Sequence, residues 1–416
     1  MRTTHPTSAI LASLVLALAT AACDDPTGPE AGPKTIATLP RDLSVVEEAV
    51  IARTNAFAFD LLREVHAANP SEPNIFLSPF SASMALGMAL NGAAGETFDS
   101  IRAALRFDGL GEAEINRAYR DLTGLLLSLD PQVELGIANS AWARQGYPVN
   151  GEYLEALETW FDAEARELDF DDPAAVDVIN GWAADKTKGR IREAIRQISK
   201  NDVFFLLNAV YFKGQWTHQF DPEHTSPGPF ALSDGTEIQL DRMRGVMPAR
   251  FALLDDVTVG ELPYGGQAFA MTIVVPRTGS LADLVASLDE ATWNRWLAAA
   301  TDREEVYVEL PKFQLQYEEN LKAALQALGM GPAFEPGRAD FSRLSPARPF
   351  ISYVKQNTFL KVDEEGTEAA AVTVVAFGRS GVLPQHQLIV DRPFLVAIRE
   401  RLSGTILFIG AIGDPR

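Results

Sequence analysis

The stretch "VDEEGTEAAAVTVVAFGRSGVLPQ", residues Val362–Gln385, combines features of a loop with features of a strand. It starts with acidic residues, passes a glycine and continues with small and β-branched residues. No proline occurs in it before Pro384, and no charge between Glu368 and Arg379. A solvated loop of this length normally carries proline and polar turn formers, whereas a buried strand is normally shorter and less rich in alanine. The segment is therefore compatible with both environments.

Composition places the remainder of the chain in the globular class. The chain has 416 residues, of which 47% are hydrophobic, enough for a sizeable core. A formal net charge of −20 disfavours nucleic acids and anionic membrane surfaces as partners, because their phosphates would be repelled. The five histidines lack HExxH spacing, and GxSxG and Walker motifs are absent, so we expect no enzyme, no metal site and no cofactor.

The N-terminal sequence "MRTTHPTSAILASLVLALATAAC" predicts export. Arg2 precedes an apolar run from Ala9 to Ala19, which is too short to span a bilayer comfortably. We expect residues 1–22 to be a signal peptide. Cys23 is the only cysteine, which rules out an internal disulfide, and its position after "TAA" resembles a bacterial lipoprotein processing site. The resemblance implies lipidation of Cys23; plain secretion with an incidental cysteine is the alternative.

Residues 23–41 predict a flexible tether, because prolines and glycines recur there among polar neighbours. From residue 42 to residue 416 the composition is globular, with no further linker and no internal repeat. We therefore expect one folded domain, 42–416, held outside the cytoplasm, either anchored to the cell envelope through a lipid or extracellular.

The folded part begins with helical patterns and ends with strands. Leu43–Ala68 has helical spacing, and Ser78 followed by Pro79 is typical of a helix start, with Ser78 as the N-cap. Val133–Gly146 alternates as a strand does, and Asp202–Trp216 is a long apolar strand of the kind buried on both faces. Such an order predicts an α+β fold with at least one large sheet.

Five stretches, in order along the chain, resemble the serpin family over residues 42–416. They are "NIFLSPFSASMALGMALNGAAGET", "LLNAVYFKGQW", "EEGTEAAA", "LIVDRPFLVAI" and "GTILFIGAIGDP". The resemblance implies the serpin fold, with a large central β-sheet, further sheets, about eight or nine helices and an exposed reactive-centre loop at about 364–385.

The resemblance also implies a function, that of a monomeric suicide inhibitor. A target serine protease would cleave the loop, remain attached as an acyl-enzyme, and be carried along as the loop inserts into the large sheet as an extra strand. The implied hinge of this movement comprises Glu365, Gly366, Thr367, Glu368, Ala369, Ala370 and Ala371.

The residues of the loop are suited to such an insertion. Alternate side chains of a strand lie on opposite faces, and one face would carry only uncharged residues: Thr367, Ala369, Ala371, Thr373, Val375 and Phe377. The alanines are small enough to enter between strands, and Gly366 supplies backbone freedom for the turn. Inserting about 13 residues at roughly 3.3 Å each would move an attached protease by about 40 Å.

Arg379 is the basic residue that the loop offers to a protease. Trypsin-like enzymes need a cation beside the scissile bond, so we expect cleavage between Arg379 and Ser380. The commonest spacing from the family's hinge would instead select Ser380 as the residue before the bond, and counting back from "RPF" on shorter-looped members would select Val382. Both alternatives imply elastase-like or subtilisin-like targets.

Other positions carry over from the family one by one. Ser78, Ser81 and Asn208 match a polar cluster beneath the point where the sheet opens, and Trp216 matches the tryptophan at the top of the opening. Gln356 stands where many members have histidine, so the cluster lacks a group that changes charge near neutral pH. The resemblance also implies that Lys213 and Gly214 shape a turn.

Three alternatives stay open at this point. One is a serpin-like protein that does not inhibit; such members usually carry bulky, charged or proline residues in the hinge, whereas this hinge, with its run of alanines and no proline, is permissive. Another is a cysteine protease as the target. The third is a metal site at His218, Asp221 and His224, which the resemblance of "WTHQFDPEHT" to a family loop disfavours.

Overall fold

A computed structural model of the chain describes Met1, residues 35–367 and residues 384–416. Residues Met1–Lys34 and Thr35–Arg416 form separate units, and the account below concerns the second. The predictions for the signal peptide and most of the tether lie outside the described residues. So do those for Cys23, Glu368, Ala369, Ala370, Ala371, Arg379, Ser380 and Val382.

Helices dominate the first half of the described chain, as predicted. In that half lie α1 (Val45–Ala68), α2 (Pro79–Gly92), α3 (Gly95–Ala104), α4 (Glu112–Ser128), α5 (Gly151–Phe161), α6 (Ala174–Lys186) and the 3₁₀ turn η1 (Pro222–His224). The second half contains α7 (Leu281–Ala286) and α8 (Glu290–Ala299). A last, interrupted helix consists of α9 (Lys322–Leu325), the π-helical turn η2 (Gln326–Met330) and α10 (Gly331–Phe334). If this segment counts as one, the described part contains nine α-helices.

The ends of two helices follow from local sequence. α1 starts at a capping box in which the Ser44 hydroxyl accepts from the backbone N–H of Glu47 and the Glu47 carboxylate accepts from that of Ser44. α2 starts at Pro79 as predicted, but the prediction that Ser78 caps it is wrong in one respect. Ser78 holds the N-cap position without a capping bond, because its hydroxyl donates instead to the carbonyl of Leu407, 2.8 Å away.

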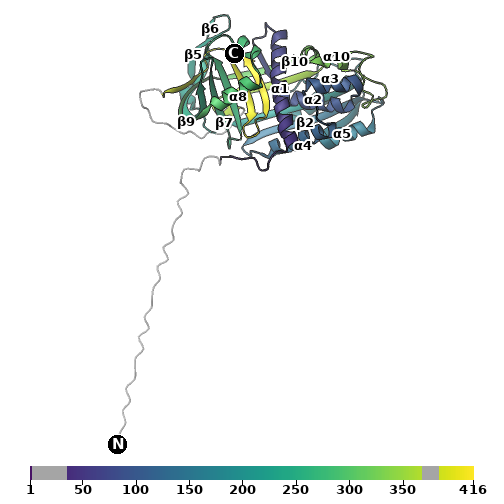
Figure 1. The fold of residues 1–416 in the computed structure, drawn as a ribbon, viewed down its shortest axis with the longest axis horizontal. Coiled ribbons are helices and arrows are strands. Elements are labelled where there is room, and N and C mark those ends of the chain that lie inside the picture. The colour runs from purple at the N-terminus through teal and green to yellow at the C-terminus, as the bar shows by residue number, and fades with distance from the viewer. Residues whose placement is uncertain (2–34, 368–383) are drawn as a thin grey trace. The chain divides into compact units, whose positions relative to one another are not determined.

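The largest sheet of the described chain has nine strands, ordered β1-β15-β14-β8-β7-β6-β9-β13 with β5 beside β6. Its strands are β1 (Asn74–Leu77), β5 (Ser226–Ala231), β6 (Glu237–Leu253), β7 (Val257–Tyr264), β8 (Phe269–Pro276), β9 (Thr301–Pro311), β13 (His386–Ile389), β14 (Phe394–Glu400) and β15 (Ile406–Ile412). Figure 1 shows β5, β6, β7 and β9 on one side of this unit and helices α2–α5 on the other.

Two smaller sheets contain the strands that matter for function. One has the order β12-β4-β2-β3, and the other pairs β10 with β11. Their bounds are β2 (Val133–Arg144), β3 (Ala163–Leu168), β4 (Phe204–Gln215), β10 (Phe313–Asn320), β11 (Lys355–Val362) and β12 (Gly366–Thr367). Lys213 and Gly214 lie within β4, so the expectation that they shape a turn is wrong.

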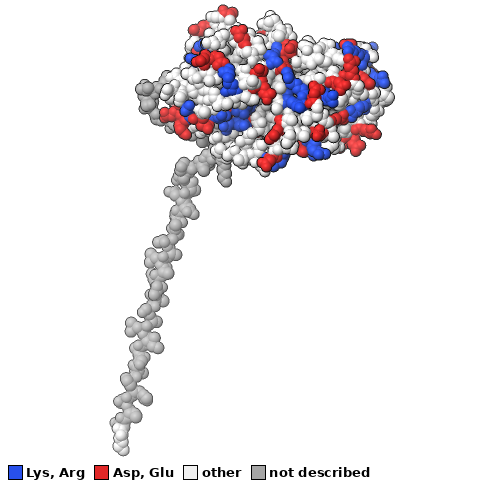
Figure 2. Space-filling model, in the orientation of Figure 1, with Lys and Arg blue, Asp and Glu red and all other residues white. Residues whose placement is uncertain are grey.

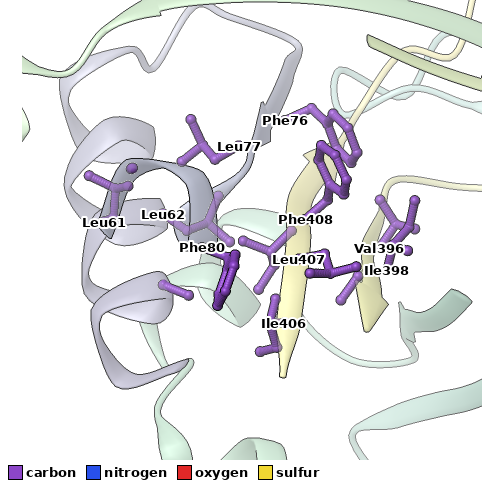
Figure 3. Packing of buried hydrophobic residues seen from close by; sticks show 14 of the residues in the cluster. Leu61, Leu62, Phe76, Leu77, Phe80, Val396, Ile398, Ile406, Leu407 and Phe408 are labelled. Carbon is purple, nitrogen blue, oxygen red and sulfur yellow. The ribbon is translucent and has the colours of Figure 1, made fainter. Parts of the chain in front are cut away.

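Alternate residues of β4 face two different hydrophobic cores. Phe212 and Val210 belong to the main core, whereas Phe205 and Ala209 belong to a smaller cluster with α6. The main core packs α1 and α2 against β1, β14 and β15, where the rings of Phe76 and Phe408 stack with centroids 5.4 Å apart (Figure 3). Each face of β4 is thus covered, as its unbroken apolar sequence predicts.

The surface carries charges of both signs. Basic and acidic side chains are interspersed over the face seen in Figure 2. No helix in the described part of the chain is both long and apolar enough to cross a bilayer.

Candidate functional site

The site lies between two strand edges that are not hydrogen-bonded to each other. One edge of β4 pairs with β2 along its length, and one edge of β11 pairs with β10. Among the described residues, β4 and β11 share no register; the only strand on the other edge of β4 is the two-residue β12, which also contacts β11. We call the space between β4 and β11 the gap; its edges can accept one more strand.

The hinge is seated at one end of the gap. Gly366 pairs with Gln215 and Thr367 with Gly214, both antiparallel. Gly366 has a φ of 152°, and a Cβ on it would lie 2.1 Å from the carbonyl oxygen of Gly214. Only glycine fits this turn.

Trp216 holds the turn that leads into the hinge. Its indole Nε1 donates to the carbonyl of Asp363, and its backbone N–H to that of Glu365, both at 2.9 Å. The indole stacks on Tyr264 with ring centroids 4.5 Å apart. Burial raises the pKa of Tyr264, so its hydroxyl stays protonated, and it shares a 2.7 Å hydrogen bond with the hydroxyl of Thr367. Trp216 is therefore a part of the site as well as a core aromatic.

An ion pair fixes the residue before the hinge. The Lys312 ammonium lies 2.8 Å from the Glu364 carboxylate, which also accepts from the Thr225 hydroxyl at 2.8 Å. Burial alone would raise the pKa of Glu364, but the Lys312 hydrogen bond, a backbone N–H and Thr225 outweigh it and hold that pKa below its usual value. The hydrogen bond from Glu364 in turn raises the pKa of Lys312.

The predicted polar cluster is assembled around the gap. Gln356 of β11 accepts from the Ser78 backbone N–H at 2.9 Å and donates to the Ser78 carbonyl at 2.7 Å. On the β4 side, the Ser81 hydroxyl donates to the side-chain oxygen of Asn208. These four residues connect α2 to both flanking strands, while Trp216 lies apart from them, with the hinge. The structure thus brings together four of the five predicted residues.

Several residues of the site were not predicted. The Asn208 amide donates to Asn139 of β2 at 2.6 Å, and the Thr358 hydroxyl of β11 donates to the Phe76 carbonyl at 2.6 Å. Tyr264 and the pair of Lys312 with Glu364 were missed as well. Asn139 and Thr358 carried a signal, because each is a polar residue at an inward position of an alternating strand.

The alternative of a metal site was tested against the described residues. No group of three or more metal-ligating side chains occurs within residues 35–367 and 384–416. Asp221, suspected of binding a metal, accepts from the backbone N–H of Glu223 at the start of η1. The arrangement is that of a sheet with room for a strand and a hinge placed to supply it.

The helical layer, the three sheets and the pairing of Gly366 and Thr367 with β4 beside a gap define an α+β protein with an incompletely paired central sheet. A model of the family described as serpin (serine protease inhibitor) matches residues 52–415. The chain belongs to the serpin family, and β12-β4-β2-β3 with β10-β11 corresponds to the large central sheet of that fold.

Known relatives cover nearly the whole domain. Iripin-2 of Ixodes ricinus is 35% identical over 88% of this chain and 94% of its own, and human neuroserpin is 33% identical over 88% and 92%. Among solved structures, the native thermophilic serpin tengpin matches with a TM-score of 0.81 and 26% identity, covering 92% of this chain and 97% of its own. Human thyroxine-binding globulin, complexed with its hormone, matches with a TM-score of 0.80 and 27% identity over 89% and 100%.

Membership confirms the predicted fold and the prediction that the chain is not an enzyme, since serpins are protease inhibitors without catalytic activity of their own. Serpins in general bind target proteases.

Proposed function

We propose that this protein is an irreversible suicide-substrate inhibitor of trypsin-like serine proteases, acting as a monomer. The observation that supports the proposal is the seating of Gly366 and Thr367 on β4, at the entrance of a gap bounded by strand edges. The following residues are small and uncharged on the face that continues from Thr367, so the pairing already begun can extend without burying an ion.

The covalent step uses the protease's own chemistry. The protease serine attacks the carbonyl carbon of Arg379, and the bond from Arg379 to Ser380 breaks. The Ser380 nitrogen takes a proton and leaves as a new amine, while an ester joins Arg379 to the protease. Hydrolysis of this ester competes with insertion of the loop. Insertion moves the ester by about 40 Å and prevents its hydrolysis by distorting the protease.

Arg379 supplies the cation that a trypsin-like specificity pocket pairs with a carboxylate. Cleavage after Ser380 or Val382 would instead indicate elastase-like or subtilisin-like targets. The same trap would act on a cysteine protease through a thioester.

The test mixes the chain, residues 24–416, with trypsin and analyses the products by denaturing gel and intact mass. We expect an adduct that survives boiling and a released peptide that begins at Ser380. Cleavage without any adduct, with elastase and subtilisin as well as trypsin, would identify a non-inhibitory member. An adduct formed only with elastase or subtilisin would contradict the trypsin-like specificity but not the trap.

We further propose that the chain is exported and anchored through a lipid on Cys23. The support is the sequence alone, in which an apolar run and small residues precede the lone cysteine. Labelling cells with a palmitate analogue should mark the wild-type chain and not a Cys23→Ala variant. An unlabelled wild-type chain with a free thiol at Cys23 would indicate plain secretion.

A further inference from the structure

Residues 35–43 are packed onto the folded domain, although the sequence predicts a flexible tether as far as residue 41. The side chains of Ile36, Leu39 and Leu43 are half-buried against the main hydrophobic core. We call residues 35–43 the strap. Hydrogen bonds hold the strap near each of its ends.

Arg41 ties the C-terminal part of the strap to two helices. Its guanidinium donates to both oxygens of the Glu47 carboxylate in α1, at 3.0 and 2.5 Å, and to the Asp121 carbonyl in α4, at 3.3 Å. Burial alone would raise the pKa of Glu47, but the bonds from Arg41 and Ser44 outweigh it and hold that pKa below its usual value. Glu47 therefore stays ionised near neutral pH, and its pair with Arg41 persists.

The N-terminal part of the strap is bonded to the turn between β7 and β8. The Ile36 backbone N–H donates to the Gly266 carbonyl at 2.7 Å. The Gly266 N–H donates in turn to the buried carboxylate of Asp130, at 2.8 Å. The strap and the Asp130 carboxylate thus hold the same peptide group from two sides.

The same turn supports the strand end on which the hinge is seated. The Gly265 N–H donates to the Gln215 carbonyl at 2.8 Å, and the Gly265 carbonyl accepts from the Thr217 hydroxyl at 2.9 Å. Gln215 is the residue of β4 that pairs with Gly366. A short path of main-chain pairings therefore leads from Ile36 through the turn to the hinge.

We propose that the strap controls how firmly the hinge is seated. While Ile36 is bonded to Gly266, the β7–β8 turn is held against the end of β4; when the strap is released, the turn and the hinge loosen together. A segment that ends a folded unit opens at less cost than core strands do, so the strap can open without unfolding of the domain. The inference goes beyond the proposed function, because it concerns the intact chain before any protease is met.

The test replaces the one backbone donor that joins the strap to the turn. Ile36→Pro removes this N–H and keeps an apolar side chain. Ala37→Pro is the matched control, because Ala37 is exposed and its N–H makes no hydrogen bond within the described residues. Hydrogen exchange is followed in the intact chain, residues 24–416, at the amides of Trp216, Gly265 and Gly366 and in strand β15.

We expect Ile36→Pro to speed exchange at these three amides by about fivefold, the effect of losing one hydrogen bond, and to leave β15 unchanged. Ala37→Pro should exchange as the wild type does. Leu39→Ala, which loosens the packing of the strap and keeps its backbone bonds, should speed the same three amides.

Other outcomes would overturn the proposal. Equal acceleration in β15 and at the hinge would mean that the strap adds only to overall stability. Hinge amides that exchange as in the wild type, or an Ala37→Pro variant as fast as Ile36→Pro, would contradict the role of the Ile36 bond. Because the measurement uses no protease, a wild type that forms no adduct with trypsin would overturn the inhibitory function and leave the role of the strap intact.

Discussion

Replacing Thr367 by arginine tests the hinge most directly. The Thr367 side chain is only 2% exposed, and its hydroxyl bonds to that of Tyr264 beneath the sheet. Among the described residues around it, Glu364 and Lys312 are already paired with each other, whereas Glu365 has one buried carboxylate oxygen without a hydrogen-bond partner. A carboxylate oxygen satisfies only part of a guanidinium with five N–H donors, so a guanidinium at position 367 would be buried without its full set of partners, or the hinge would leave the sheet.

The size of the effect follows from the cost of burying a charge without its full set of partners. Such a charge costs about 3 kcal/mol or more, and every 1.36 kcal/mol is about a factor of ten. The seated hinge should thus become at least about 100-fold less populated. If insertion starts from the seated hinge, it slows by a similar factor, and hydrolysis of the acyl-enzyme prevails.

The assay is the number of inhibitor molecules consumed for each trypsin inactivated, with a denaturing gel to count adduct against cleaved chain. Thr367→Arg should give cleaved chain with little adduct, at an unchanged rate of cleavage. Thr367→Ser, which keeps the hydroxyl, should resemble the wild type. An arginine variant that inactivates trypsin as efficiently as the wild type would refute the argument that insertion passes through the pairing of Thr367 with Gly214.

Three more predictions concern the surroundings of the hinge. Gly366→Ala should shift the products of the trypsin reaction from adduct toward cleaved chain, because the alanine Cβ would lie 2.1 Å from the Gly214 carbonyl oxygen. A yield of adduct equal to that of the wild type would contradict this. Glu364→Gln should melt at a lower temperature than the wild type at pH 7. Because the pKa of Glu364 is lowered in the fold, its pair with Lys312 stabilises the fold above pH 4.5, and this stabilisation is lost as pH falls through the lowered pKa. The difference in melting temperature should therefore shrink in melting curves taken below pH 4.5. Gln356→His should make melting temperature fall from pH 8 to about pH 6, since a protonated imidazole cannot accept the Ser78 N–H, whereas the wild type should show no such step.

The sequence predicted the helices and strands better than it predicted which side chains form hydrogen bonds with each other. Strands β2 and β4 are readable from alternation and from an apolar run respectively, and α1 from its helical spacing. The pairing of Ser78 with Gln356 is not, because the two are far apart in the chain and nothing local marks a serine for a distant amide rather than for the helix it precedes. Ser78 was expected to cap α2 for that reason. Its place in the cluster came from the family resemblance.

The gap itself was beyond local reasoning for a different physical cause. A strand edge left unpaired looks, in sequence, like any other strand, since neither the alternation nor the composition of β4 and β11 records which of their edges is paired. The sequence of the loop does, however, contain polar and apolar residues that can be compared with those that line the gap. Along the inward face of that segment the polar residues are Thr367 and Thr373. The structure places polar side chains beside the gap at two levels, the Tyr264 hydroxyl at the hinge and the amides of Asn208 and Gln356 farther along the gap.

This correspondence indicates whether the loop sequence is adapted to the exposed state of the loop or to its inserted state. In a loop that only presents a bond to a protease, the residues upstream of that bond are free to vary between polar and apolar at each step. If the loop must fill the gap, the residues on its inward face can no longer vary freely. A hydroxyl placed opposite apolar side chains, or a valine placed opposite two amides, would leave a buried polar group without a hydrogen bond, at a cost of about 1–3 kcal/mol. The order threonine, alanine, alanine, threonine, valine, phenylalanine at alternate positions from Thr367 carries no charge, and its polar members are two threonines. If the proposed function holds, this composition follows from the need to fill the gap rather than from presentation of a bond to a protease.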